Sequence, residues 1–191
     1  LLDWIRQIKE ETAAYAAANP GEPVAPFAVN QIAHPSNPRL PADMEVCVRE
    51  EVPIIITSLN PPAEIVQAVH AYGGLVFHDV INLRHARKAI SQGVDGVIAV
   101  CAGAGGHAGM LNPFALVGEL RKEFDGCVIL SGCISRGDDV LAAIEDESGV
   151  PHGETCRTQR AVDVTFHVAA GADDEDLRLG HDIPVAGCTV H

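Results

Sequence analysis

The amino-acid sequence predicts an α/β protein built around a parallel β-sheet. Short apolar runs alternate with amphipathic stretches, and this alternation repeats about every 20 to 30 residues. Two of the runs, residues 53–56 and 128–130, are apolar without interruption. A continuous apolar run is typical of a strand that is buried on both faces, as strands of parallel sheets are.

The strands and helices can be assigned in order. Strands are expected at residues 25–30, 52–58, 75–80, 94–101 and 128–134, and helices at 3–18, 42–50, 62–72, 83–92, 113–124 and 138–147. Asn82 is a predicted cap for the fourth helix, Gly93 is its predicted stop, and Pro113 suits a first helical position. Five strands leave an open doubly wound sheet and a closed (β/α)₈ barrel as competing arrangements.

The end of the chain follows a different pattern. Residues 162–168 alternate strictly, as a half-exposed strand does, and residues 173–176 form an acidic cluster. The regular α/β pattern does not continue beyond about residue 149. We therefore divide the chain into an α/β region, residues 1–149, and an atypical C-terminal tail, residues 150–191.

Composition narrows the possible partners and compartment. The 191 residues include 26 acidic and 13 basic ones, and a formal net charge of −13 argues against nucleic acid or an anionic membrane. The six cysteines form no CxxC pair, so we expect reduced thiols and a cytosolic protein. No signal peptide, membrane-spanning run, HExxH or HxH pattern is found, and no metal site is expected.

The most distinctive segment is glycine-rich and contains a histidine. The sequence AGAGGHAG, residues 102–109, follows the strand predicted at 94–101 and places His107 beside Gly105 and Gly106. Glycines allow close approach of the backbone to a ligand, and α/β proteins place their sites at the carboxyl ends of strands. The alternative is a tight turn with an incidental histidine.

Other polar groups follow the remaining strands. Gly132 and Cys133 come after the fifth strand, where backbone N–H groups could hold a phosphate. Asn30 ends the first strand, Thr57 and Ser58 end the second, and His78 lies near the end of the third. Each of these could line a pocket, or could be an ordinary turn or strand-end residue.

Taken together, these segments resemble the nitronate monooxygenases. The matching stretches are PFAVN (26–30), VPIIITS (52–58), GVDG (93–96), AGGHAG (104–109) and LSGCI (130–134). The resemblance implies a (β/α)₈ barrel of the TIM type that binds FMN without a covalent bond. It also implies oxidation of an alkyl nitronate, or a nitroalkane, by O₂ to a carbonyl compound and nitrite.

The resemblance also implies roles for particular residues. His107 would be the catalytic histidine, and a pKa near neutrality suits it to accept a proton or to bond a nitro group. Asn30, His78, Gly105 and Gly106 would face the flavin, whereas Gly132 and Cys133 would bind its phosphate.

The chain departs from the family at both ends. Its five strands correspond to about the third to the seventh of the barrel, so the barrel is expected to be incomplete, with open edges that allow self-association. Nothing in residues 150–191 matches the phosphate loop after the eighth strand. Two alternatives stay open: a related FMN- and NAD(P)H-dependent enoyl reductase, and a non-catalytic truncated barrel that acts as a binding module.

Overall fold

The computed structural model describes residues 1–60, 63–105, 109–132, 134 and 136. The described helices are α1 (Leu2–Ala18), α2 (Leu40–Arg49), α3 (Ala63–His70), α4 (Leu83–Ser91) and α5 (Pro113–Arg121). The described strands are β1 (Ala28–Ala33), β2 (Ile54–Leu59), β3 (Leu75–Val80), β4 (Gly96–Val100) and β5 (Cys127–Ser131).

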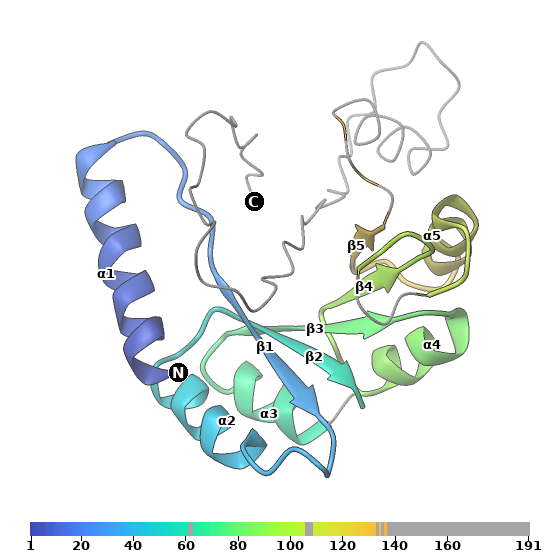
Figure 1. Ribbon diagram of the computed structural model, residues 1–191, viewed down its shortest axis with the longest axis horizontal. Coiled ribbons are helices and arrows are strands. Elements are labelled where there is room, and N and C mark those ends of the chain that lie inside the picture. Colours follow the sequence, from blue (N-terminus) through green and yellow to red (C-terminus); the bar gives the residue numbers. More distant parts are fainter. Residues whose placement is uncertain (61–62, 106–108, 133, 135, 137–191) are drawn as a thin grey trace.

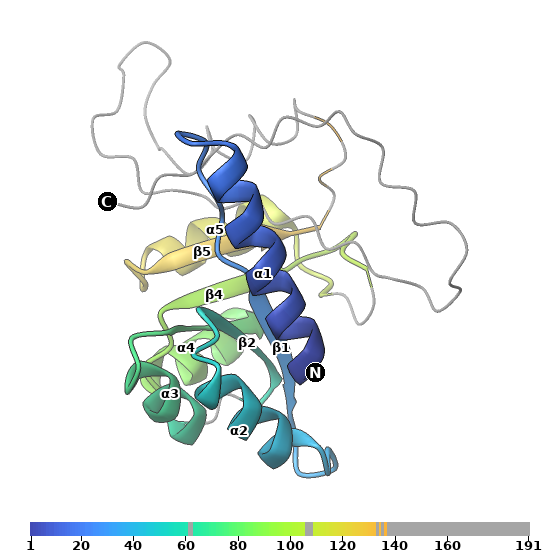
Figure 2. The ribbon, with the colours of Figure 1, turned by 90° about the vertical axis from the view of Figure 1, so that its left-hand side faces the viewer.

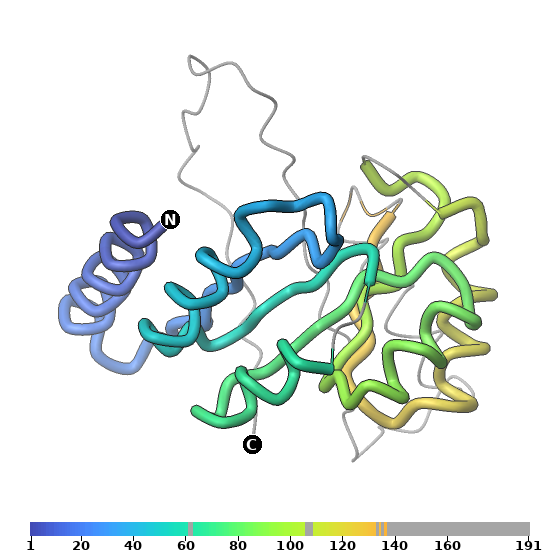
Figure 3. Tube along the Cα trace, turned by 90° about the horizontal axis from the view of Figure 1, so that it is seen from below, coloured from blue at the N-terminus to red at the C-terminus, as the bar shows by residue number. Residues whose placement is uncertain are grey.

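The five strands form one parallel sheet in the order β1-β2-β3-β4-β5 (Figure 1). Each neighbouring pair is joined by a helix, and α2 to α5 follow one another around one side of the sheet (Figure 3). Strand order therefore equals chain order, which is the arrangement of a barrel wall. A doubly wound sheet would instead reverse its strand order at a switch point.

Local signals place most elements where the sequence predicts them. The Asn82 side chain accepts a hydrogen bond from the backbone N–H of His85 and caps α4, and Asn112 caps α5 in the same way ahead of Pro113. Gly93 follows the end of α4 with a φ of 86°, a left-handed conformation that favours glycine. The helix predicted at 138–147 and the strand predicted at 162–168 lie outside the described residues, as does the predicted boundary at 149.

The first strand is the element whose position the sequence misplaces. β1 begins at Ala28 and continues to Ala33, so Asn30 is its third residue and does not end it. β1 pairs only with β2 in the described sheet, so it is an edge strand there. Its alternate residues Ala28, Asn30 and Ile32 are exposed, so one of its faces is also uncovered. Its buried positions include the polar Gln31, and it therefore lacks the continuous apolar run of a central strand.

The sheet has two faces with different surroundings. On the helix face, side chains such as Ile55, Val76 and Val97 join helix residues in the main apolar core. On the other face, which we call the inner face, Phe77, Ile98 and Ile129 form a second buried cluster. Alternation along the strands separates the two sets, because successive side chains of a strand point to opposite faces.

Helix α1 lies across the β1 side of the sheet (Figure 2). Ile5 is buried in the main core, whereas Trp4 is 73% exposed. Arg6 forms an ion pair of 3.1 Å with Glu50 at the end of α2, and Lys9 also contacts Glu50. One apolar anchor and these surface contacts attach the helix.

The predicted reduced state of the thiols stays a prediction. Among the described cysteines, Cys47 and Cys101 are buried and Cys127 is partly buried. None of the helices in the described part of the chain has the length and apolar character that crossing a membrane requires.

Candidate functional site

The inner face has an apolar centre and a polar rim. Phe77, Ile98 and Ile129 form the centre. Alternation places Asn30, Ser58 and Asp79 on the same face, with Asn30 at the middle of β1 and the other two near the carboxyl ends of β2 and β3. The carboxyl ends of parallel strands are where α/β proteins build their sites. The structure therefore brings three polar side chains together beside an apolar surface.

Hydrogen bonds join these three side chains. Ser58 Oγ lies 2.6 Å from Asp79 Oδ2 and 3.2 Å from Asn30 Oδ1. Ser58 and Asp79 are partly buried, whereas Asn30 is exposed. The carboxylate and hydroxyl thus form a supported pair, and the amide is the member that a ligand could reach.

The number of available protons fixes which group donates and which accepts in these two hydrogen bonds. The Ser58 hydroxyl carries one proton, and the much shorter contact assigns it to the carboxylate of Asp79. The Asn30 amide then bonds Ser58 most favourably when it is turned by 180°, so that its NH₂ donates to Ser58 Oγ. This orientation leaves the Asn30 carbonyl as an acceptor at the rim, with a second N–H as a donor.

The loops that follow β4 and β5 pack closely against each other. The Cys101 backbone N–H donates to Ser131 O at 2.8 Å, and Gly132 has a φ of 126°. A Cβ at Gly132 would lie 2.9 Å from Ala104 N and 3.1 Å from Ala102 O. Glycine is therefore required here, and the approach places the two glycine-containing loops side by side.

A second glycine closes the other end of the β4 loop. A Cβ at Gly109 would lie 2.1 Å from Val100 O, a separation that no side chain can adopt. Gly105 is exposed, and a Cβ there would meet nothing within 4 Å. Gly106, His107 and Cys133 lie outside the described residues, so their predicted roles stay predictions.

His78 is on the helix face and not on the inner face. It is 2% exposed, and its Nδ1 lies 2.8 Å from Oγ1 of Thr57, its neighbour in β2. Burial, together with the positive charges of His85 and Lys88, lowers the pKa of His78 to about 4. The structure does not bring His78 together with Asn30, and its predicted contact with a flavin stays a prediction.

Sequence reasoning gave no role to Asp79, the residue of β3 that does reach the polar rim. Strand alternation carries the missing signal. Once Phe77 is assigned to the inner face, Asp79 must share that face and His78 must point the other way. The sequence alone did not say which of the two faces the helices cover.

The inner face holds groups of the two kinds that the flavin implied by the resemblance would need. An isoalloxazine ring needs an apolar bed and polar partners at its pyrimidine edge, and the Ile98 cluster and the Asn30 amide are of these two kinds. The Asp79 carboxylate would repel a phosphate, so the phosphate belongs elsewhere on the rim. Gly132 packs against the loop after β4, and its predicted contact with the phosphate stays a prediction.

The described fold is part of the wall of an α/β barrel of the TIM type, and similarity to known proteins shows which family the chain belongs to. The sequence profile of the nitronate monooxygenases matches residues 5–148, and the chain belongs to this family. It is 34% identical over 90 residues to a nitronate monooxygenase of Neurospora crassa, across 42% of this chain and 24% of that one. It is also 29% identical over 119 residues to a Rhodococcus jostii hydroxy-methyl-oxo-octahydro-indene-carboxyl-CoA dehydrogenase, across 62% of this chain and 33% of that one.

Solved structures give the same architecture. FabK from Thermotoga maritima aligns with a TM-score of 0.59 at 27% identity, over 72% of this chain and 43% of that one. Nitroalkane oxidase from Streptomyces ansochromogenes aligns with a TM-score of 0.62 at 19% identity, over 76% of this chain and 52% of that one. The chain spans between 24% and 33% of the length of the curated relatives it matches.

Proposed function

We propose that the chain acts as an FMN-dependent nitronate monooxygenase, which oxidises alkyl nitronates with O₂ to a carbonyl compound and nitrite. The family match over residues 5–148 carries this proposal. The polar rim of Asn30, Ser58 and Asp79 on the inner face supports it. When bound, FMN would supply the redox chemistry, taking electrons from the substrate and passing them to O₂.

The roles of the protein groups follow from their places in the fold. The Asn30 amide would bond the pyrimidine edge of the flavin, and the Ser58–Asp79 pair would hold that amide in one orientation. Gly105 and Gly106 would let the backbone lie against the ring. Gly132 and Cys133 would donate backbone N–H groups to the phosphate.

His107 is the proposed catalytic residue. It would accept the proton that a nitroalkane loses, or donate a hydrogen bond to the nitro group of a nitronate, and a neutral imidazole and an imidazolium suit these two tasks respectively. The resemblance in the AGGHAG segment supports this role. On the helix face, His78 would support the sheet, and we do not assign it a contact with the substrate.

Partners and compartment follow the same proposal. Small-molecule substrates and O₂ would be the partners of a cytosolic enzyme. β1 and β5 each have one neighbour in the described sheet, and Ile32 of β1 is 44% exposed. Self-association through these edges is therefore proposed, and light scattering after gel filtration tests it: a purely monomeric chain would contradict it.

The activity is tested with the full chain supplied with FMN. In air-saturated buffer, an alkyl nitronate should give nitrite and consume O₂. His107→Ala should lower the rate at least about 100-fold, because general acid–base catalysis contributes that much. His152→Ala, in the tail without family match, is the matched control and should not change it.

Two results would contradict the proposed activity. Equal rates for wild type and His107→Ala would remove the role of His107. A flavin-loaded chain that oxidises NAD(P)H with an enoyl thioester, and gives no nitrite, would favour the related enoyl reductase instead.

A further inference from the structure

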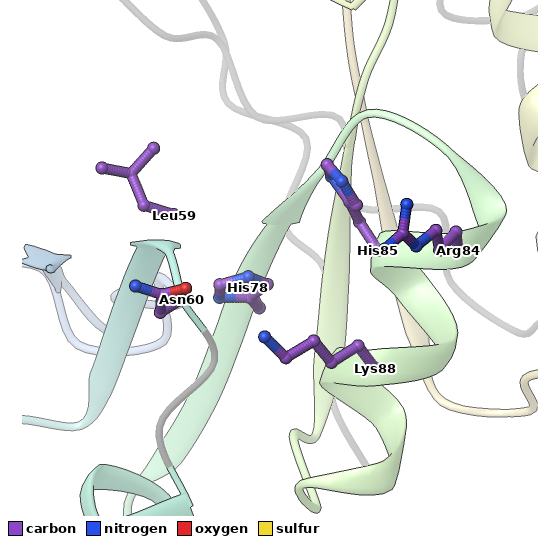
Figure 4. Close-up of a pocket in the computed structure, with 6 residues that line it drawn as sticks. All are labelled: Leu59, Asn60, His78, Arg84, His85 and Lys88. Atoms are coloured by element: carbon purple, nitrogen blue, oxygen red, sulfur yellow. The ribbon is translucent and has the colours of Figure 1, made fainter.

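A cavity of about 270 Å³ opens on the helix face, between the ends of β2 and β3 and the start of α4 (Figure 4). The residues that line it are Leu59, Asn60, His78, Arg84, His85 and Lys88. The cavity lies on the opposite face of the sheet from Asn30 and Asp79. It is therefore separate from the candidate flavin site.

The lining of this cavity is cationic in an acidic protein. Arg84, His85 and Lys88 all come from α4, and none of the six lining residues is acidic. The chain has twice as many acidic as basic residues, yet the first turn of α4 holds no acidic residue. A helix N-terminus carries a positive partial charge, so Arg84 and His85 in the first turn are unfavourable there unless an anion joins them, whereas Lys88 lies in the last turn.

These three side chains have no acidic partner in the part of the chain that the structure describes. The ion pairs formed there use other basic residues, of which Arg87 with Glu123 is the one on the same helix. In Figure 4 the Lys88 side chain extends toward His78 and Asn60. Positive charge is thus gathered around a cavity and is not neutralised within the described fold.

His78 adds a buried polar atom to the same cavity. Thr57 Oγ1 donates to Phe77 O at 3.2 Å and lies 2.8 Å from His78 Nδ1. A hydroxyl has one proton, so Nδ1 must carry the proton of that second bond and donate it to Thr57. Burial keeps the imidazole neutral, with its pKa lowered to about 4.

It follows that His78 Nε2 is an unprotonated acceptor. The ring is 2% exposed, and Nε2 has no partner among the described residues. A buried acceptor without a hydrogen bond is unfavourable, so a ligand with an O–H or N–H group would be favoured at this position. The cavity thus combines cations at its α4 side with a neutral acceptor on β3.

We propose that this cavity binds the phosphate group of a phosphate monoester or of free phosphate. The anionic oxygens would contact Arg84 and Lys88, and the remaining P–OH would donate to Nε2 of His78. A phosphate monoester has its second pKa near about 6, so its singly protonated form, which prevails below that pH, can donate this hydrogen bond. Carboxylates and sulfate bring no such proton, and they would leave Nε2 unpaired.

The overall acidity of the chain does not oppose this site strongly. Charges more than about 8 Å apart are largely screened at physiological ionic strength, so Arg84 and Lys88 dominate the local field. The inference does not rest on the proposed oxidation of nitronates. It needs neither bound FMN nor turnover, and each can fail without the other.

The test is a titration of the full chain with inorganic phosphate, glycerol 1-phosphate and sulfate. Calorimetry gives each affinity, and NMR of the imidazole nitrogens reports on His78. We expect phosphate to bind and to move the Nε2 resonance of His78. Sulfate should bind about tenfold more weakly, because it cannot donate the hydrogen bond to Nε2.

Charge variants locate the site without disturbing the core. Lys88→Gln should weaken phosphate binding at least about tenfold, because it removes one charge-assisted hydrogen bond. Lys122→Gln removes the same charge from the exposed end of α5, outside the cavity, and should leave the affinity unchanged. Circular dichroism should show that both variants are folded.

The two phosphate probes distinguish the sources of the ligand. Tighter binding of glycerol 1-phosphate would assign the cavity to a phosphate ester, and tighter binding of inorganic phosphate would assign it to the free ion. No binding of either probe would overturn the proposal. Binding that leaves the Nε2 resonance of His78 unmoved, or that Lys88→Gln and Lys122→Gln weaken equally, would also overturn it.

Discussion

Replacing Gly132 by alanine tests how the loops after β4 and β5 are held together. Gly132 has a φ of 126°, which an alanine adopts only under strain. The new Cβ would lie 2.9 Å from Ala104 N, 3.1 Å from Ala102 O and 3.2 Å from Cys101 O. All three neighbours are backbone atoms, so no side-chain rotation can relieve the contacts.

Two contributions set the loss of stability: the strained backbone conformation and the steric overlap of the new Cβ. A residue held in an unfavourable backbone conformation costs about 1 to 3 kcal/mol, and overpacking against fixed atoms adds a similar amount. We expect Gly132→Ala to lower the free energy of unfolding by at least about 2 kcal/mol. With a slope of about 2 kcal/mol per molar urea, the unfolding midpoint would fall by about 1 M.

Gly118→Ala is the matched control. Gly118 lies in α5, and a Cβ there would meet nothing within 4 Å. Alanine in an exposed helix should raise the free energy of unfolding by about 0.5 to 1 kcal/mol. If urea denaturation gave the same midpoint for wild type and Gly132→Ala, the close approach of the two loops would be refuted.

Other predictions concern the buried pair on the helix face and the rim on the inner face. Thr57→Val should lower the free energy of unfolding by about 1 to 3 kcal/mol, because His78 Nδ1 loses its acceptor, and Thr57→Ser should restore most of it; equal urea midpoints for the two variants would contradict this. The pKa of His78 is lowered from 6.5 to about 4, so below pH 6.5 the unfolded chain binds a proton that the folded chain does not. Stability should therefore fall by about 3 kcal/mol between pH 6.5 and 4, and His78→Gln should flatten this dependence in urea titrations at each pH. Ser58→Ala should weaken FMN binding, measured by flavin fluorescence, about tenfold through loss of the bond that orients Asn30; an unchanged affinity would sink the proposed role of the rim.

Most of the fold could be predicted because its central strands have an unambiguous pattern. The prediction for the strand at Leu75–Val80 matches to the residue, and Asn82 and Pro113 mark real helix starts. The edge strand β1 was misplaced, because exposure on one face and the buried Gln31 break its apolar run. Periodicity could not choose between sheet and barrel, since strand order depends on tertiary pairing.

The site was less predictable, for a reason of geometry. A strand pattern shows that Phe77 and His78 point to opposite faces, but it does not show which face the helices cover. The three-residue rim also depends on the register of β1, β2 and β3, in which Ile32 pairs with Ser58 and Thr57 with His78. Register is a long-range property, so Asp79 emerges as a rim residue only in the folded chain.

FMN binding by the full chain tests the central claim most directly. We predict that FMN added to the protein shows shifted absorbance bands and weaker fluorescence, and that binding saturates at about one FMN for each chain. Asn30→Leu should weaken this binding. Gln7→Leu, on the exposed face of α1, should not. Riboflavin, which lacks the phosphate, should bind more weakly than FMN. An unchanged flavin spectrum at every protein concentration, or equal binding by wild type and Asn30→Leu, would contradict the account.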